Sequence, residues 1–543
     1  MAKVKSFWVA AGSVVVAIAC GSVDDAAPPR EEARPSRTGE VQSAAAGSCS
    51  GVCGGQSPDK TCWCDFYCTQ YSDCCGDYVP LCTNDQCTKA KVLQYAPFET
   101  TQYTTYAKTA STDPGLTCAS GTGNPIQANN TVWFKFTTTH AGTVVIDGTG
   151  TNYGLNIGIH RGSCGNFTQV ACAFLNGEDK SFRFEAAANR TYYVQVGDWY
   201  GDGGGGGLLK FRLDFFRWTF KAMPQGSQPF KIVVDPTNDN VWYVGTTDGV
   251  YVTKNGGSTW THTLAGTLSW GIAADPSKPG IVYVGSDSTL FVAANGGDSW
   301  FPIGYFPHTV YSVHVSPSGE IYVGNYWGGS PDKPGIFKAA NGTSPFNFFP
   351  FNIPAIPGGQ DKGLILWDIA QDSQNGFLYI GAETAGKPTN VPYDPPTLRS
   401  KDGGQTWQDV SGQLGTAGSL PHHATSVQVG SNHEVYFQVE GGQLFTSTNF
   451  GDTWQGKAQN VAWDMIVDPN NTSKIFSGSV STTTMSLSTD DGAHFRPIGP
   501  PDGGDSGMLH FAFSKSGGTL YAAREASSRP GVYVISAGDN FTF

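Results

Sequence analysis

Alternation of apolar and polar residues marks a series of short segments between residues 84 and 217. The clearest is TVWFKFT at 131–137, and further apolar segments lie at 142–146, 155–160, 181–184, 191–197 and 208–215. A period of two places successive side chains on opposite faces of a strand. Short strands at regular spacing, separated by turn residues, predict a β-sandwich for this part of the chain.

A longer repeat occupies residues 218–543. One unit reads IVVDPTNDNVWYVGTTDGVYVTKNGGSTW (232–260) and the next reads IAADPSKPGIVYVGSDSTLFVAANGGDSW (272–300). The closing pattern S/T-x-N/D-x-G-x-S/T-W/F recurs at 400–407, 447–454 and 488–495, and in degraded form at 339–346 and 536–543. Seven units of roughly 45 residues predict a seven-bladed β-propeller with four strands per blade. Residues 218–223 resemble the segments that follow the other units, so we expect them to complete the last blade and close the ring.

The closing pattern resembles the Asp-box repeat of sialidases, sortilin-like proteins, xyloglucanase-type glycosidases and photosystem assembly factors. Its chemistry is that of a turn, because Asn or Asp caps the turn with its side chain and Gly supplies the positive φ. The final aromatic residue is expected to wedge against the neighbouring unit. We therefore interpret Asp402 and Asp490, which stand in two of these patterns, as structural and not catalytic.

Composition and charge fit an all-β, multidomain protein of this kind. The chain has 543 residues, of which 14% are charged and 70 are glycine. Low charge and abundant glycine are typical of many short strands joined by turns. The formal net charge of −12 argues against a nucleic-acid partner, which needs a basic surface. It also argues against electrostatic binding to anionic lipid.

The amino terminus resembles a bacterial lipoprotein signal. A short basic start precedes an apolar run at 7–19, which is too short to span a bilayer, and Ala17-Ile18-Ala19-Cys20 follows. A plain secretory signal also fits. Thirteen cysteines favour the lipoprotein, because acylation of Cys20 leaves twelve that can pair. We expect a signal peptide at 1–19, a flexible tether at 20–47, and an exported outer-membrane or cell-surface lipoprotein, otherwise a secreted protein.

Residues 48–83 hold eight cysteines: Cys49, Cys53, Cys62, Cys64, Cys68, Cys74, Cys75 and Cys82. So small a module must be stapled by disulfides, which an exported chain favours over zinc. The adjacent Cys74-Cys75 pair and the Cys62-Trp63-Cys64 step resemble a somatomedin-B domain. The spacing leaves the connectivity open among 105 possibilities. In the vitronectin-like members of that family the segment between the third and sixth cysteines binds protein partners, and the matching positions here are Asp65, Phe66, Tyr67 and Tyr71. Phe66 and Tyr67 differ from the residues of those members, so their partners do not transfer, and a rigid spacer is the alternative.

Residues 84–217 resemble the bacterial prepeptidase C-terminal type of jelly roll in the order VWFKFT…AGTVVI…GIHRGSC…VACAF…RTYYVQVG. Cys164 and Cys172 lie eight residues apart across an expected hairpin, so we predict that they pair and that Cys87 pairs with Cys118. Asp198 and Asp202 flank a glycine-rich loop. Two carboxylates beside backbone carbonyls suit calcium, although a simple hairpin tip is the alternative. We expect no other cofactor.

Loops on a rigid scaffold commonly carry function, and the long insertions at 326–335, 383–398, 411–423 and 497–508 should share one face of the propeller. The inner strands begin near Trp270, Tyr311, Trp367 and Trp463, with Phe230 and His510 at similar positions. Tyr326, Trp327, Glu383 and Glu525 come just after second strands. Aromatic rings beside carboxylates suit a carbohydrate or a peptide. The alternative is that the tryptophans only pack between blades.

A glycoside hydrolase needs two opposed carboxylates, for which Asp248, Asp368 and Asp464 are candidates. The repeats hold too few arginines for a sialidase, and xyloglucanase-type enzymes usually pair two propellers, whereas this chain has one. We therefore expect non-catalytic binding or adhesion at the cell surface, with an extracellular protein or glycan as partner and a lipid anchor as the only membrane contact. Hydrolysis of extracellular glycans is the alternative.

Overall fold

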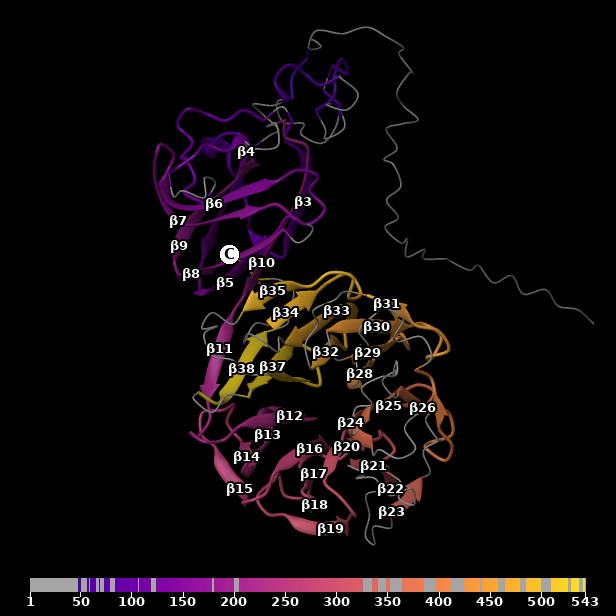
Figure 1. Cartoon of the computed structure of the whole chain (residues 1–543). Helices are drawn as coiled ribbons and strands as arrows, with labels where there is room; N and C mark the ends of the chain where they lie inside the picture. Colours follow the sequence, from indigo (N-terminus) through magenta and orange to yellow (C-terminus); the bar gives the residue numbers. More distant parts are fainter. Residues whose placement is uncertain are drawn as a thin grey trace, which may run out of the picture. The chain divides into compact units, whose positions relative to one another are not determined.

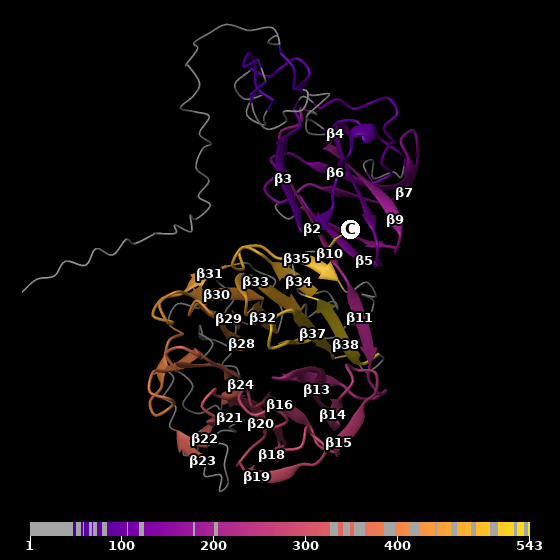
Figure 2. The ribbon, with the colours of Figure 1, turned by 180° about the vertical axis from the view of Figure 1, so that it is seen from behind.

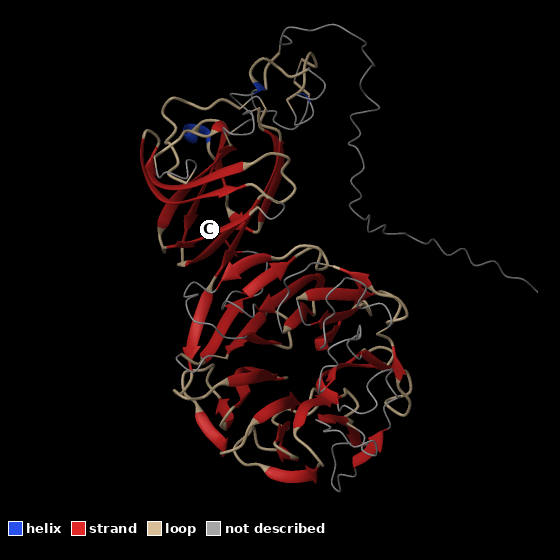
Figure 3. Ribbon diagram, viewed as in Figure 1, coloured by secondary structure: helices blue, strands red, loops and turns tan. Residues whose placement is uncertain are grey.

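In the computed structural model the regular secondary structure is almost entirely β-strand (Figure 3). No helix in the described part of the chain is long and apolar enough to cross a bilayer. The chain divides into two compact units at Gly76 and Asp77. The structure describes residues 47–49, 56–57, 59–64, 68, 73–78, 84–105, 107–118, 124–177, 180–199, 205–325, 335–339, 348–351, 364–384, 397–411, 424–439, 442–457, 464–478, 485–499, 509–525, 529–536 and 541–542.

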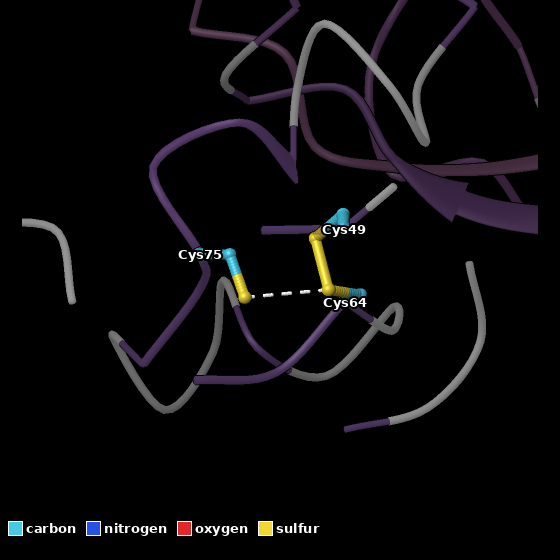
Figure 4. Close-up of side chains that lie close together, drawn as sticks. All are labelled: Cys49, Cys64 and Cys75. Atoms are coloured by element: carbon cyan, nitrogen blue, oxygen red, sulfur yellow. Dashed lines mark hydrogen bonds between the residues drawn. A yellow bond between two sulfur atoms is a disulfide. The ribbon is translucent and has the colours of Figure 1, made fainter. Parts of the chain in front are cut away.

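The first unit contains a small disulfide knot. Its described disulfides are Cys49–Cys64, Cys62–Cys75 and Cys68–Cys74. Two of these disulfides pack directly on each other, since Cys75 Sγ lies 3.3 Å from Cys64 Sγ (Figure 4). All of these sulfurs are in disulfides and none is a thiolate, so the preference for disulfides over zinc is confirmed for these residues. Cys53 and Cys82 lie outside the described residues.

The second unit begins with a 3-10 turn at Cys87–Lys89 and a sandwich of two sheets. The five-stranded sheet has the order β1 (Lys91–Val92), β4 (Asn129–Thr138), β9 (Arg190–Asp198), β6 (Leu155–Ser163) and β7 (Asn166–Leu175). The four-stranded sheet has the order β3 (Phe98–Tyr103), β10 (Leu208–Phe216), β5 (Gly142–Asp147) and β8 (Ser181–Ala186). Val132, Phe134 and Phe136 of β4 are buried in the core between the sheets, as their alternation predicts.

The sandwich disulfides differ from the predicted pairing. The structure joins Cys87 to Cys164 and Cys118 to Cys172, with Cα atoms 5.8 and 5.9 Å apart. Cys164 lies in the turn between β6 and β7, whereas Cys172 lies well inside β7, opposite Gly158. At about 3.3 Å per residue along a strand, the two are on the order of 20 Å apart, far beyond the reach of a disulfide. The prediction of Cys164–Cys172 and Cys87–Cys118 is therefore wrong, because the eight-residue spacing runs along one strand.

Seven four-stranded antiparallel sheets follow the sandwich and form a propeller (Figures 1 and 2). Blades one and two consist of β12 (Pro229–Asp235), β13 (Asn238–Thr246), β14 (Gly249–Thr253) and β15 (Thr261–Ala265), then β16 (Ser269–Ala274), β17 (Val282–Ser286), β18 (Thr289–Ala293) and β19 (Phe301–Tyr305). Blades three and four consist of β20 (Val310–Val315), β21 (Ile321–Asn325), β22 (Ile336–Ala339) and β23 (Phe348–Phe351), then β24 (Leu364–Gln371), β25 (Leu378–Thr384), β26 (Thr397–Ser400) and β27 (Gln408–Asp409). Blades five and six consist of β28 (Ala424–Val429), β29 (Val435–Val439), β30 (Gln443–Ser447) and β31 (Gln455–Gly456), then β32 (Met465–Asp468), β33 (Asn471–Gly478), β34 (Met485–Ser488) and β35 (Arg496–Gly499).

Blade seven closes the ring with a strand from the other end of the repeat region. It consists of β36 (Leu509–Phe513), β37 (Thr519–Arg524), β38 (Gly531–Ser536) and β11 (Trp218–Ala222). β11 pairs antiparallel with β38, with Trp218 opposite Ile535. The prediction that residues 218–223 complete the last blade is confirmed. A last strand, β39 (Phe541–Thr542), pairs with β2 (Tyr95–Ala96) of the sandwich sequence.

The repeated turn between the third and fourth strand of a blade has the expected geometry. Asp402 Oδ1 accepts a hydrogen bond from the Thr406 amide at 2.8 Å, and Ser400 Oγ accepts one from the Gly404 amide. Gly404 has a φ of +92°, which favours glycine. The closing aromatic reaches the neighbouring blade, as Trp260 Nε1 donates to the Ala222 carbonyl. The carboxylate of this turn is occupied by its own backbone, which supports a structural role.

The sandwich and propeller contact each other through blade six. The Arg496 guanidinium is almost fully buried, with Nη2 2.9 Å from Asp214 Oδ2 and Nη1 3.3 Å from Asp147 Oδ2. Val145 of β5 packs in the same apolar cluster as Phe476. A buried cation held by two carboxylates fixes the geometry of this contact.

Substituting Gly531 should weaken ring closure. A Cβ at this position would lie 2.4 Å from Phe220 Cζ and 2.7 Å from the Lys221 carbonyl oxygen, both on β11. We expect Gly531→Ala to lower the free energy of unfolding by about 1–3 kcal/mol, as overpacking does, measured by denaturant unfolding. In the control Gly518→Ala, the new Cβ meets only Ser516 Oγ at 3.5 Å. Equal stability of both variants would contradict a closing role for β11.

Candidate functional site

The inner strands share an equivalent position near the axis of the propeller, where the side chains from blades one and four contact each other. In five blades this strand carries a register shift near its start, for example between Leu366 and Asp368 in β24. The residue after the shift lies four positions before the turn to the second strand, and the same position exists in the other two blades. We call these seven residues the channel ring: Lys231, Gly271, Ser312, Asp368, Ser426, Asp464 and His510.

Lys231 and Asp368 meet across the channel. Lys231 belongs to blade one and Asp368 to blade four, and Nζ lies 3.2 Å from Oδ1. Blades one and four are not neighbours, so the lysine side chain must extend across the axis. Burial alone would lower the pKa of Lys231, but the carboxylates of Asp368 and Asp464 outweigh it and raise that pKa. Burial raises the pKa of Asp368, which the ammonium of Lys231 offsets only in part.

A second charged group links blades six and seven. His510 Nδ1 lies 3.4 Å from Asp464 Oδ2, and His510 Nε2 lies 3.7 Å from Glu525 Oε2. Burial alone would lower the pKa of His510, but hydrogen bonding and attraction from Asp464 and Glu525 raise it. The imidazole is therefore stabilised in its charged form between two carboxylates.

The carboxylates of the channel ring also hold neighbouring inner strands together. Asp368 Oδ2 accepts from the Val427 amide of blade five at 3.2 Å. Asp464 Oδ2 accepts from the Phe511 amide of blade seven at 3.3 Å, and its Oδ1 from its neighbour Met465 at 2.9 Å. Backbone donors and a cation thus occupy both carboxylates. A general acid and base for hydrolysis would need opposed carboxyl groups facing the substrate, so this bonding favours a structural role.

Aromatic rings from four successive blades gather beside the channel ring, each one residue before a ring member. Phe230 stacks on Trp270 with centroids 3.9 Å apart, and Trp270 lies 5.7 Å from Tyr311. Trp367 lies 5.1 Å from Tyr311 and 6.0 Å from Trp270, although Trp270 and Trp367 belong to non-adjacent blades. We call these four residues the aromatic cluster.

The aromatic cluster joins a carboxylate at the end of β25. Trp367 Nε1 donates to Glu383 Oε2 at 2.8 Å. Phe230 is 7% exposed, whereas Trp270, Tyr311 and Trp367 are half-buried. The rings therefore pack on one another and still present surface. The structure brings Trp270, Tyr311, Trp367 and Glu383 together, and brings Asp464, His510 and Glu525 together.

Asp248 has different surroundings. Its side chain is 53% exposed at the turn from β13 to β14, with Oδ2 3.9 Å from His262 Nε2. His262 lies on the outermost strand of blade one, where its ring stacks on Tyr251. The contacts of Asp248 are thus with the outer part of its own blade, and those of Asp368 are within the channel.

Several predicted site residues lie outside the described residues. These are Cys20, Asp65, Phe66, Tyr67, Tyr71, Asp202, Tyr326, Trp327 and Trp463. Asp198, the other calcium candidate, is buried at the end of β9, and its Oδ2 accepts from the Gly206 amide at 2.7 Å. One oxygen of this carboxylate is therefore hydrogen-bonded to the backbone at Gly206.

Sequence reasoning missed Lys231 as a site residue. The signal that finds it is the alignment of the inner strands, because Lys231 stands four residues before Asp235 as Asp368 stands four before Asp372. A lysine among ring positions held by Asp, Ser, Gly and His is unusual, and its partner is 137 residues away in sequence.

Two segments match known domain families. Residues 47–85 match the somatomedin B domain, which confirms the resemblance read from the cysteines. Residues 83–202 match a galactose binding domain-like family, which differs by name from the prepeptidase C-terminal type. No curated protein matches the chain.

Several solved structures resemble part of the chain. YCF48 from Cyanidioschyzon merolae shares 13% identity over 59% of this chain and 98% of that one, with a TM-score of 0.43. The GH74 xyloglucanase from Xanthomonas campestris shares 14% over 57% and 52%, with a TM-score of 0.41. The extracellular domain of a putative one component system from B. thetaiotaomicron shares 11% over 59% and 40%, with a TM-score of 0.44. Likeness at this level carries no inference about activity.

The His510 contacts should make stability depend on pH. Because the folded-state pKa of His510 is raised, its stabilising contribution is complete below the unfolded value of about 6.5 and is lost as pH rises through the folded value. We expect His510→Gln to lower the free energy of unfolding at pH 6 and to approach the parent protein at pH 9, measured by denaturant unfolding. The exposed His140 of the sandwich, changed to Gln, serves as control. A deficit that is constant or grows with pH would contradict the charged form.

Proposed function

We propose that this protein is an exported, surface-displayed binding protein whose propeller holds a glycan against the aromatic cluster without cleaving it. The observation that carries this proposal is the mutual contact of Trp270, Tyr311 and Trp367, half-buried and joined to Glu383. Half-exposed rings stack on the apolar faces of sugars, and a neighbouring carboxylate accepts hydrogen bonds from hydroxyl groups.

Further polar groups near the rings support a hydroxyl-rich ligand. The indole Nε1 of Trp270 is buried and donates to no protein acceptor among the described residues. A donor without an acceptor costs free energy, so a ligand hydroxyl oxygen would accept from this N–H if the Trp270 ring moved to expose it. Lys231, the residue after Phe230, has a side chain that is one-third exposed and whose ammonium pairs with Asp368.

Hydrolysis is the less supported alternative. Asp368 and Asp464 are held by Lys231, His510 and backbone amides, so neither carboxylate has the freedom of a general acid or base. A glycoside hydrolase also needs room for water or a covalent intermediate between its carboxyl groups. Binding uses the same residues without this demand.

Trp367→Ala should abolish most glycan binding. A truncated aromatic anchor costs about 2 kcal/mol, roughly thirty-fold in Kd, measured by calorimetry on the glycan that binds best in an array. Phe301→Ala is the control, because Phe301 is 61% exposed on β19 and should leave Kd unchanged. Thermal unfolding verifies that both variants fold. Equal Kd for both variants overturns the assignment of the site, and release of reducing sugar that Asp368→Asn removes would establish hydrolysis instead.

We further propose that Cys20 carries the membrane anchor and that residues 20–47 act as a tether. The described disulfides support an oxidising, exported environment. In bacterial cells that process such signals, Cys20→Ser should move the protein from the membrane fraction to the soluble fraction, whereas Ser22→Ala should leave it membrane-bound. Intact mass of the parent protein should include the lipid. An unacylated amino terminus, or membrane association that survives Cys20→Ser, contradicts this anchor.

A further inference from the structure

A depression lies at the end of the propeller channel opposite the aromatic cluster. It has a volume of about 320 Å³, and most of the residues that line it, drawn from blades one, two, three and seven, have apolar side chains. Pro236, Pro276 and Lys515 belong to turns between first and second strands. These turns share a face with the repeated closing turns, since the Gly296 amide donates to the Gly280 carbonyl. Glu383 lies at the end of the second strand β25, and Glu525 follows the second strand β37, so both belong to the opposite face.

The depression arises from the register of the inner strands. Val233, Ala273, His314 and Ala512 each lie two residues after a member of the channel ring. Residues two apart on a strand project to the same side, so these four side chains continue the channel below the ring. Two of them, Ala273 and Ala512, are alanines, whose small side chains leave space at this level. At the level of the channel ring, larger side chains such as those of Lys231 and His510 occupy the space.

Two residues of the lining have polar side chains, His314 and Lys515. His314 Nε2 lies 3.4 Å from Gln371 Oε1, and the Gln371 amide nitrogen donates to the Gly376 carbonyl, so Nε2 carries the proton. Burial lowers the pKa of His314 to about 4, with Lys231 also lowering it. The ring is neutral at pH 7. Lys515 is then the charged group of the lining, and no carboxylate of the described residues pairs with it.

We propose that this depression binds a small amphiphile with one anionic group, its apolar body against Val233, Ala273 and Ala512 and its anion on Lys515. A volume of about 320 Å³ is within the range of small-molecule sites, which are mostly apolar with few polar groups. The chain carries a formal charge of −12 and repels anions in general. Lys515, which has no carboxylate partner among the described residues, is the group of this rim that would attract an anion. This site is separate from the glycan site at the opposite face.

Two dyes of nearly equal shape test the proposal on the full-length protein. Anilinonaphthalene sulfonate carries the anion, and N-phenyl-1-naphthylamine lacks it; each is titrated by fluorescence at pH 7.5. We expect saturable 1:1 binding of both. Lys515→Gln should weaken sulfonate binding about five-fold, as an ion pair at a partly exposed site allows, and should leave the neutral dye unchanged. Lys278→Gln, a lysine on the same face but outside the lining, should change neither.

Filling the depression provides an independent readout. Ala273→Leu should weaken both dyes about ten-fold, and Ala512→Leu, in another blade, gives the same test if the first variant is destabilised. Thermal unfolding and glycan affinity verify the fold and the opposite face. Sulfonate affinity that is unchanged in Lys515→Gln overturns the anion contact. Dye affinities unchanged in both leucine variants overturn the site itself, without bearing on the glycan proposal.

Discussion

The antiparallel pairing of β11 with β38 is the constraint on which the propeller depends. It converts seven sheets that could follow one another in an open arc into a ring with no free end. The charged contacts of the channel exist only in that ring, because Lys231 comes from blade one, Asp368 from blade four and His510 from blade seven. The contacts of the site therefore depend on closure of the ring. The Phe220 ring on β11 packs against the Tyr533 ring on β38, which stabilises the closing pair of strands.

Closure also creates an electrostatic problem that the channel solves by pairing. Buried charges are costly unless paired and hydrogen-bonded. Among the described residues, the channel holds the carboxylates of Asp368, Asp464 and Glu525, the ammonium of Lys231 and the imidazole of His510. Lys231 compensates Asp368, and His510 lies between Asp464 and Glu525. Backbone amides of the neighbouring blades also donate hydrogen bonds to Asp368 and Asp464, so these two residues hold neighbouring blades together. This arrangement favours a fixed binding surface over groups that must exchange protons with a substrate.

The sequence predicts the blades well because their signals are local. The closing turn, its glycines and the two-residue alternation each act within one unit. Residues 218–223 supply the fourth strand of blade seven and are recognisable because they resemble the segments that follow the other closing turns. Contacts between distant residues are harder. The prediction that Cys164 pairs with Cys172 was wrong, because spacing does not reveal which residues lie along one strand. Lys231 was missed because its partner Asp368 is three blades away. That Trp270, Tyr311 and Trp367 lie together could be predicted, since each occupies the same place in its repeat.

One structural rule accounts for both ends of the channel. Each inner strand contributes a ring residue and, two positions later, a second residue on the same side, so a substitution at one level leaves the residue at the other level unchanged. Charged residues at the first level are polar neighbours of the aromatic cluster. At the second level, the small side chains of Ala273 and Ala512 leave the apolar depression. A propeller can thus vary its two faces separately with single substitutions on seven strands, and a ligand at one face need not compete with a ligand at the other.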